Sequence, residues 1–216
     1  MLMSDGSIVR YKFVQRVGHA INAIAFFTLL ITGLFLFFSP FFALGSHASR
    51  IIHRIAAVFL FLGPIMYFLT DPKDILHLLK ASFTYNKNDV IWLIKMPFYF
   101  IGLAEGLPPQ GEINAGQRLH HAATVIFYNL IALSGIALWI GSARLGQELF
   151  LWMLMLHDVS MVILTVLMIG HMYFSFVYGA VNNMITGRIS AAYAQIEHPL
   201  WVEELKQEKV KEVEAK

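Results

Sequence analysis

Long apolar stretches alternate with polar segments along the chain. Four of them have the length of a membrane span, and they cover residues 19–43, 51–70, 119–140 and 149–178. Because about 20 helical residues cross the roughly 30 Å of hydrocarbon in a bilayer, each stretch is long enough to span. The first stretch also exceeds the apolar part of a signal peptide, which is about 7–15 residues long. The pattern therefore predicts four retained transmembrane helices in an all-α, integral membrane four-helix bundle.

Two other segments are expected outside the spans. The apolar run of residues 90–104 is interrupted by Lys95 and Pro97, so it is too short to cross and should lie at the membrane interface within the long middle loop. Residues 191–216 are polar, and their end, "EELKQEKVKEVEAK", predicts a solvated helix. We expect a transmembrane domain of residues 1–190 and a polar cytoplasmic tail of residues 191–216.

The distribution of Lys and Arg predicts the orientation. One side of the membrane would carry Arg10, Lys12, Arg16, Lys73, Lys80, Lys87, Lys95, Arg118, Arg188, Lys206, Lys209, Lys211 and Lys216. The other side would carry Arg50, Arg54 and Arg144. Both termini and the middle loop are therefore expected in the cytoplasm.

The composition limits the class of protein and the side chains that could bind a metal or haem. The 216 residues are 57% hydrophobic and 14% charged, which is typical of a membrane protein and not of a soluble domain. A net charge of +2, with no basic patch interleaved with aromatic residues, argues against nucleic acid as a partner. The chain has no cysteine, which excludes disulfides, iron–sulfur clusters held by this chain and covalently attached haem. Nine histidines and ten methionines remain as ligands for a metal or haem.

Two histidines of the fourth span face one side at two depths. His157 and His171 are fourteen residues apart, which on a helix is about 21 Å of rise and a return to within about 40° of the same face. His53 opens the second span from the outer side, and His19 opens the first from the cytoplasmic side. Depth pairs His53 with His157 and His19 with His171, which predicts two b-type haems about 20 Å apart.

Alternatives exist for each histidine. His120 and His121 begin the third span at the cytoplasmic side, so by depth either could replace His19. A single histidine in a membrane span can be a hydrogen-bonded structural residue, whereas four that pair by depth favour haem ligation. Surface positions are expected for His47, His77 and His198. The roles of Asp158, His120 and His121 stay open.

Five segments resemble the cytochrome b, or gamma, subunit of membrane-bound respiratory formate dehydrogenase. They are "YKFVQRVGHAINAIAFFTLLITGL" (11–34), "SRIIHRIAAVF" (49–59), "PPQGEINAGQRLHHA" (108–122), "LMLHDVSM" (154–161) and "IGHMYFSFVYGAVNNMITGRIS" (169–190). The resemblance covers almost the whole chain. It implies a multi-pass protein of the bacterial inner membrane, with an iron–sulfur beta subunit and a periplasmic catalytic alpha subunit that carries molybdenum or tungsten.

The resemblance also implies roles for individual residues. The positions that match the family's haem ligands are His19, His53, His157 and His171, which favours His19 over His120 and His121. Electrons from formate would reach menaquinone or ubiquinone near the cytoplasmic face.

The quinone pocket of the family lies beside the inner haem, at positions that match Asn114, Gly116 and Gln117 here, with His171 as a further hydrogen-bonding group. The same turn has the pattern of a helix cap, and the two roles are compatible. Arg16, Arg54 and Arg118 are placed to meet haem propionates, or to anchor the helices at the interfaces.

Two other functions are compatible with parts of the same pattern. The same haem and quinone chemistry would serve the cytochrome b subunit of a periplasmic hydrogenase or a thiosulfate reductase, because this chain holds no formate-binding chemistry of its own. A haem-free membrane anchor or a small transporter is a second alternative, although four spans without obvious inverted halves argue against a transporter.

Overall fold

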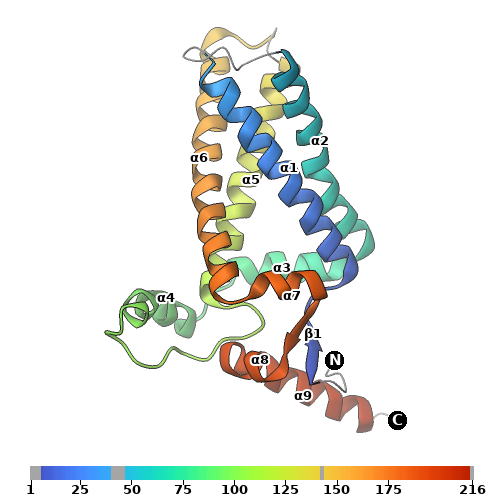
Figure 1. Ribbon diagram of the computed structural model, residues 1–216, viewed down its shortest axis with the longest axis vertical. Helices are drawn as coiled ribbons and strands as arrows, with labels where there is room; N and C mark the ends of the chain where they lie inside the picture. The colour runs from blue at the N-terminus through green and yellow to red at the C-terminus, as the bar shows by residue number, and fades with distance from the viewer. Residues whose placement is uncertain (1–5, 40–46, 142–143, 215–216) are drawn as a thin grey trace. The chain divides into compact units, whose positions relative to one another are not determined.

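The computed structural model describes residues 6–39, 47–141 and 144–214, and its main feature is four long apolar helices (Figure 1). These helices are α1 (Phe13–Phe37), α2 (His47–Thr70), α5 (Ala115–Gly141) and α6 (Gln147–Val177). All four are long and apolar enough to cross a membrane. The prediction of an all-α membrane protein with four spans is therefore confirmed.

All four helices begin earlier than their apolar stretches do. α1 begins at Phe13 and α5 at Ala115, whereas the apolar stretches begin at residues 19 and 119. In α1 the Gln15 side chain accepts a hydrogen bond from the backbone N–H of Lys12 at 2.6 Å, and this cap starts the helix within a polar segment. Hydropathy locates the membrane-crossing part of a helix, while capping decides where its backbone begins. The end of the first predicted span, at residue 43, lies outside the described residues.

The described residues form two units by their contacts, and each is considered by itself. One unit consists of Tyr11–Leu76 and Met184–Gly187, and it holds the α1–α2 hairpin. Within the hairpin the helices approach most closely at glycines, since a Cβ added to Gly63 would lie 2.8 Å from the backbone oxygen of Gly18. Small residues are the usual means by which membrane helices approach closely.

The polar end of this unit is held together by side chains. Lys12 pairs with Asp71, and Gln15 donates to Tyr67 at 2.7 Å and to Asp74 at 2.8 Å. These contacts join the start of α1 to the end of α2 and to the first turn of α3 (Pro72–Phe83).

The second unit comprises Met1–Arg10, His77–Asn183 and Arg188–Lys216. Its α5 and α6 form the other long hairpin, and α4 (Lys87–Phe100) is packed on α5 through Trp92. At 14 residues α4 is too short to span, as predicted for the interfacial run. Exposed aromatic and aliphatic side chains gather at its end: Phe98, Tyr99, Phe100, Ile101 and Leu103.

A small structure that the sequence did not predict lies in the same unit. Strand β1 (Ser7–Val9) pairs antiparallel with β2 (Arg188–Ser190), with Ile8 opposite Ile189. Three further helices are α7 (Ala180–Thr186), α8 (Ala191–Glu197) and α9 (Pro199–Glu214). The strands, α8 and the start of α9 share a core of Ile8, Ile189, Ala194, Trp201 and Val202.

The tail is therefore only partly solvated. In α9 the side chains of residues 203–211 are largely exposed, as predicted, whereas Trp201 and Val202 are 8% and 7% exposed. The guanidinium of Arg10 lies 4.5 Å from the centre of the Trp201 ring, a cation–π contact with the N-terminal segment. Nothing in the sequence indicated this core, because its five residues are widely separated along the chain and form no periodic pattern.

Candidate functional site

His53 on α2 packs against α1, where a hydroxyl determines which nitrogen of the ring carries hydrogen. Oγ1 of Thr32 lies 2.9 Å from Nδ1 of His53 and 2.7 Å from the carbonyl oxygen of Thr28. Because the carbonyl only accepts, the hydroxyl donates to it and accepts from the Nδ1–H of His53. The neutral ring then carries no hydrogen on Nε2, whose lone pair can bind a metal.

His157 on α6 is held in the same way against α5. Its Nδ1 lies 3.1 Å from the carbonyl oxygen of Ile131 and 3.2 Å from Oγ of Ser134. The Ser134 hydroxyl donates to the carbonyl of Leu130 at 2.7 Å, so it accepts from the imidazole. Nδ1 therefore carries the hydrogen, and Nε2 again carries none, so its lone pair has the form that binds a metal.

A glycine follows the hydroxyl residue in both hairpins and makes room for the ring. A Cβ placed on Gly33 would lie 3.4 Å from Cε1 of His53, and one on Gly135 would lie 3.1 Å from Cε1 of His157. The second distance is tighter than ordinary carbon contacts, so a side chain at position 135 would require the ring of His157 to shift by a few tenths of an ångström. The sequence does contain "TG" and "SG" on the helix that precedes each histidine. Hydrophobic periodicity alone does not indicate that these dipeptides face a histidine.

The other two predicted ligands lie toward the opposite ends of the long helices. His19 is in the second turn of α1, and its side chain is exposed. His171 lies in the same continuous helix as His157, α6, so the spacing of about 21 Å along one helix is retained. The ring of His171 stacks on that of His120, with 5.1 Å between ring centres and 14° between planes.

The polar turn before α5 is a helix cap. The backbone N–H of Gln117 donates to Oδ1 of Asn114 at 2.8 Å, and the N–H of Asn114 donates to Oε1 of Gln117 at 2.9 Å. The cap uses both side-chain oxygens and leaves both NH₂ groups as donors. Gly116 faces Trp92 of α4, because a Cβ there would lie 3.1 Å from the indole ring.

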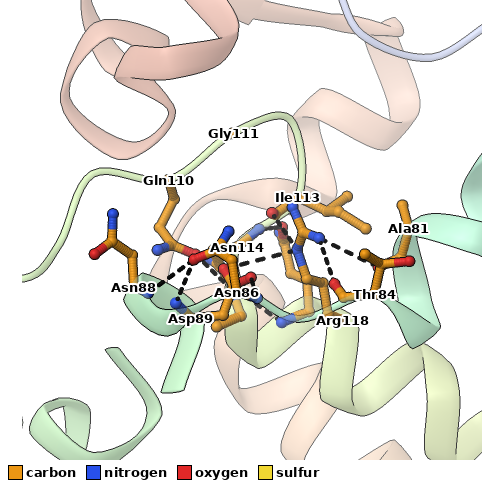
Figure 2. Close-up of polar contacts among 12 residues, drawn as sticks. Ala81, Thr84, Asn86, Asn88, Asp89, Gln110, Gly111, Ile113, Asn114 and Arg118 are labelled. Carbon is orange, nitrogen blue, oxygen red and sulfur yellow. Dashed lines mark hydrogen bonds and ion pairs between the residues drawn. The ribbon is translucent and has the colours of Figure 1, made fainter. Parts of the chain in front are cut away.

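The arginine beside this turn has partners within the protein (Figure 2). Arg118 donates to the carbonyls of Thr84 at 2.8 Å and Ala81 at 3.3 Å, and its Nε lies 3.9 Å from Oδ1 of Asp89. It therefore joins the start of α5 to the loop between α3 and α4. Gln110, which the sequence analysis did not single out, accepts from the N–H of Ala115 at 2.7 Å and is 4% exposed.

The two remaining arginines differ in their surroundings. Arg16 donates to the carbonyls of Met184 and Ile185, near the end of α7, and so caps carbonyls that the short helix leaves unpaired. Arg54 follows His53 on α2 and is exposed.

The chain was compared with known proteins by family and by sequence. Residues 10–187 match the prokaryotic cytochrome b561 family. This chain belongs to that family. It is thus a multi-pass membrane cytochrome of the b type, for which the family implies haem b, and the two histidine environments described above fit axial ligation.

Known relatives of this cytochrome cover nearly its full length. It is 27% identical to the formate dehydrogenase cytochrome b556(fdo) subunit of Escherichia coli strain K12, over 96% of this chain and 98% of the relative. It is 24% identical to the nitrate-inducible formate dehydrogenase cytochrome b556(Fdn) subunit of the same strain, over 94% of each chain. A formate dehydrogenase cytochrome b556 subunit of Haemophilus influenzae is 24% identical, over 94% of this chain and 85% of the relative. The predicted resemblance is confirmed.

The histidines expected at the surface of this cytochrome do not all lie there. His47 and His77 are exposed, as predicted. His198 is 5% exposed, so that prediction is wrong: its Nδ1 lies 2.8 Å from the carbonyl oxygen of Gly111, and its ring meets Trp201 edge-on. Burial, with the positive charge of Arg10 nearby, lowers the pKa of His198 to about 4.

Proposed function

We propose that this cytochrome is the membrane subunit of a formate dehydrogenase complex that delivers electrons to quinone. The relatives named above are subunits of such complexes, and the similarity to them extends over almost the whole chain. An iron–sulfur beta subunit and a molybdenum or tungsten catalytic alpha subunit would supply the electrons on the periplasmic side. Two haems b, when bound, supply one-electron carriers between the beta subunit and the quinone.

His53 and His157 are proposed as the axial ligands of the outer haem, and His19 and His171 as those of the inner haem. The observation that carries the proposal is the contact at Nδ1 in both His53 and His157, which puts the ring hydrogen on Nδ1 and not on Nε2. Haem iron takes a neutral imidazole through one nitrogen while the other donates to a protein group.

His19, and not His120, is proposed as the inner partner of His171. Two axial ligands approach one iron end-on from opposite sides, whereas the rings of His120 and His171 lie face to face. As they lie, these two rings cannot share an iron. His120 would instead stack on the face of the His171 ring while His171 binds the iron.

A site for menaquinone or ubiquinone is proposed at the start of α5, with Asn114, Gly116, Gln117 and His171. The NH₂ groups that the cap leaves over supply hydrogen-bond donors for a quinone carbonyl. Trp92 and the end of α4 supply apolar surface of the kind that binds a quinone ring and tail. Arg16, Arg54 and Arg118 are kept as proposed partners for haem propionates, and Arg16 and Arg118 also hold backbone carbonyls.

The proposed setting is the inner membrane of a bacterium, with residues 1–190 as the membrane domain and residues 191–216 in the cytoplasm. The excess of Lys and Arg at both termini and in the middle loop supports this orientation. Lipid would cover the exposed apolar side chains of the four spans.

A reduced-minus-oxidised spectrum of the purified complex tests the proposal. Formate should produce b-type bands that an added quinone removes. Bands that appear with hydrogen or thiosulfate chemistry but never with formate would favour the cytochrome b subunit of a hydrogenase or thiosulfate reductase. The complete absence of b-type bands would contradict electron transfer by this chain.

A further inference from the structure

The two hairpins contain the same arrangement of three residues around a histidine. In α1 the sequence Thr32-Gly33 faces His53, and in α5 the sequence Ser134-Gly135 faces His157. In each, the hydroxyl meets Nδ1 and the glycine lies against Cε1. Thr32 is 6% exposed and Ser134 is 0% exposed, so both hydroxyls are enclosed.

Neither hydroxyl is needed by its own helix. Threonine and serine within a helix commonly donate to the carbonyl four residues earlier, as Thr32 does to Thr28 and Ser134 does to Leu130. In that bond the hydroxyl hydrogen is used, so the hydroxyl oxygen can act toward a further group only as an acceptor. In both hairpins this lone pair is directed at an imidazole Nδ1.

We propose that Thr32 and Ser134 are positioning residues for the outer haem, which hold His53 and His157 with Nε2 directed to the iron and tune its reduction potential. The inference rests on the proposed function, because it requires these two histidines to be haem ligands. A hydrogen bond from Nδ1–H raises the electron-donating strength of an axial imidazole and favours the ferric state. Both hydroxyls therefore lower the potential of the outer haem.

The arrangement has a functional consequence. Each hairpin supplies one hydroxyl contact to a proposed haem ligand, and at His157 the carbonyl of Ile131 shares Nδ1 with the hydroxyl. If these histidines held the haem that first takes electrons from the beta subunit, the two hydroxyl contacts would favour onward transfer toward the inner side. The inner histidines stand in a different environment, since His171 lies in a ring stack with His120.

The test is potentiometry on the complete complex with single variants. Thr32→Val keeps the shape of the side chain and removes the acceptor, and Thr32→Ser restores it. Thr28→Val is the matched control, because the Thr28 hydroxyl donates to the carbonyl of Ile24 on the same helix at 2.8 Å. Ser134→Ala removes a single oxygen and leaves the carbonyl of Ile131 on Nδ1, so it covers the case in which Thr32→Val does not assemble.

The expected result is a higher midpoint potential for one haem in Thr32→Val and in Ser134→Ala, with an altered low-spin EPR signal for the same haem. Haem affinity at that site should fall by roughly 10- to 100-fold, the usual effect of removing such a partner. Thr32→Ser should restore the wild-type potential, and Thr28→Val should not change it.

Two outcomes would overturn the inference while the proposed function stands. Wild-type potentials and EPR signals for both haems in Thr32→Val and Ser134→Ala would show that the hydroxyls have no influence on the iron. An equal shift in Thr28→Val would show a general effect of altering α1. If the wild-type complex itself contains no haem, the proposed function fails, and that result is distinguishable from both.

Discussion

The imidazole ring of His120 lies face to face with that of His171, with 5.1 Å between their centres and 14° between their planes. His121 is adjacent and meets His120 edge-on at 6.1 Å. Three histidines thus meet where α5 begins and α6 ends, and only one of them is assigned to an iron. By their predicted depth in the membrane, His120 and His19 were equally possible partners of His171, and the stack distinguishes the two.

Replacing His120 should leave both haems in place. We expect His120→Gln to retain two haems per chain, because a ring stacked on the ligand of an iron cannot also be the opposite ligand of that iron. Haem extraction with quantified protein measures the ratio, and His19→Ala, which should lose the inner haem, is the positive control. A ratio near one in His120→Gln, with His19→Ala unaffected, would reverse the assignment.

The glycines beside the outer histidines should differ in their tolerance of alanine. Gly135→Ala places a Cβ 3.1 Å from Cε1 of His157, whereas Gly33→Ala places one at 3.4 Å from Cε1 of His53. The closer contact must displace the ring, since the helix backbone has little freedom to move. We expect Gly135→Ala to lose more of the outer haem than Gly33→Ala does, as measured by haem content. Equal retention in the two variants would mean that the rings adjust freely.

Variants of Gln117 can distinguish the two roles of the turn before α5, which are helix capping and the proposed binding of quinone. Gln117→Glu keeps the oxygen that accepts from the N–H of Asn114 and replaces the NH₂ donor by a second oxygen. We expect both haems to stay bound and reducible by formate, while reoxidation by quinone slows by roughly five- to 150-fold, as for a lost hydrogen bond of about 1–3 kcal/mol.

Gln117→Leu is the companion variant in stopped-flow measurements, because it removes donor and cap together and should also cost about 1 kcal/mol of stability. Rapid reoxidation in Gln117→Glu would leave this turn as a helix cap alone, and the quinone site would then be sought at His120 and His121.

Acid should loosen the small core formed by β1, β2, α8 and α9. His198 is neutral when buried, with a folded-state pKa of about 4 against 6.5 for an exposed histidine. Protonation of His198 favours the unfolded state, in which the imidazole is exposed to water. The contribution of His198 to stability is therefore complete above pH 6.5 and decreases as the pH falls from 6.5 toward 4. At about 1.4 kcal/mol per pKa unit, the full loss is roughly 3 kcal/mol.

Hydrogen exchange of residues 188–211 at pH 7.5 and pH 5 measures this effect. His198→Asn keeps a donor for the carbonyl of Gly111 and cannot be protonated, so its exchange should depend much less on pH. Equal acid sensitivity in the variant and the wild type would assign the effect to groups other than His198.

The sequence predicted the four spans because hydrophobicity and length alone decide them, and it predicted the positions of His157 and His171 because helix geometry is regular. It did not predict the core around Trp201, whose members come from both ends of the chain, nor the burial of His198. The hydroxyls of Thr32 and Ser134 were missed for a different reason. Their role depends on which residue the neighbouring helix presents, and no periodicity within one helix contains that information.

The assignment of His53 and His157 to one outer haem is the centre of this account, and single variants test it directly. His53→Ala and His157→Ala should each give a complex with one haem per chain, and the remaining haem should have the same potential and EPR signal in both. That haem should be reduced by an added quinol analogue but no longer by formate. If the two variants lose different haems, or if either keeps two, the pairing is contradicted.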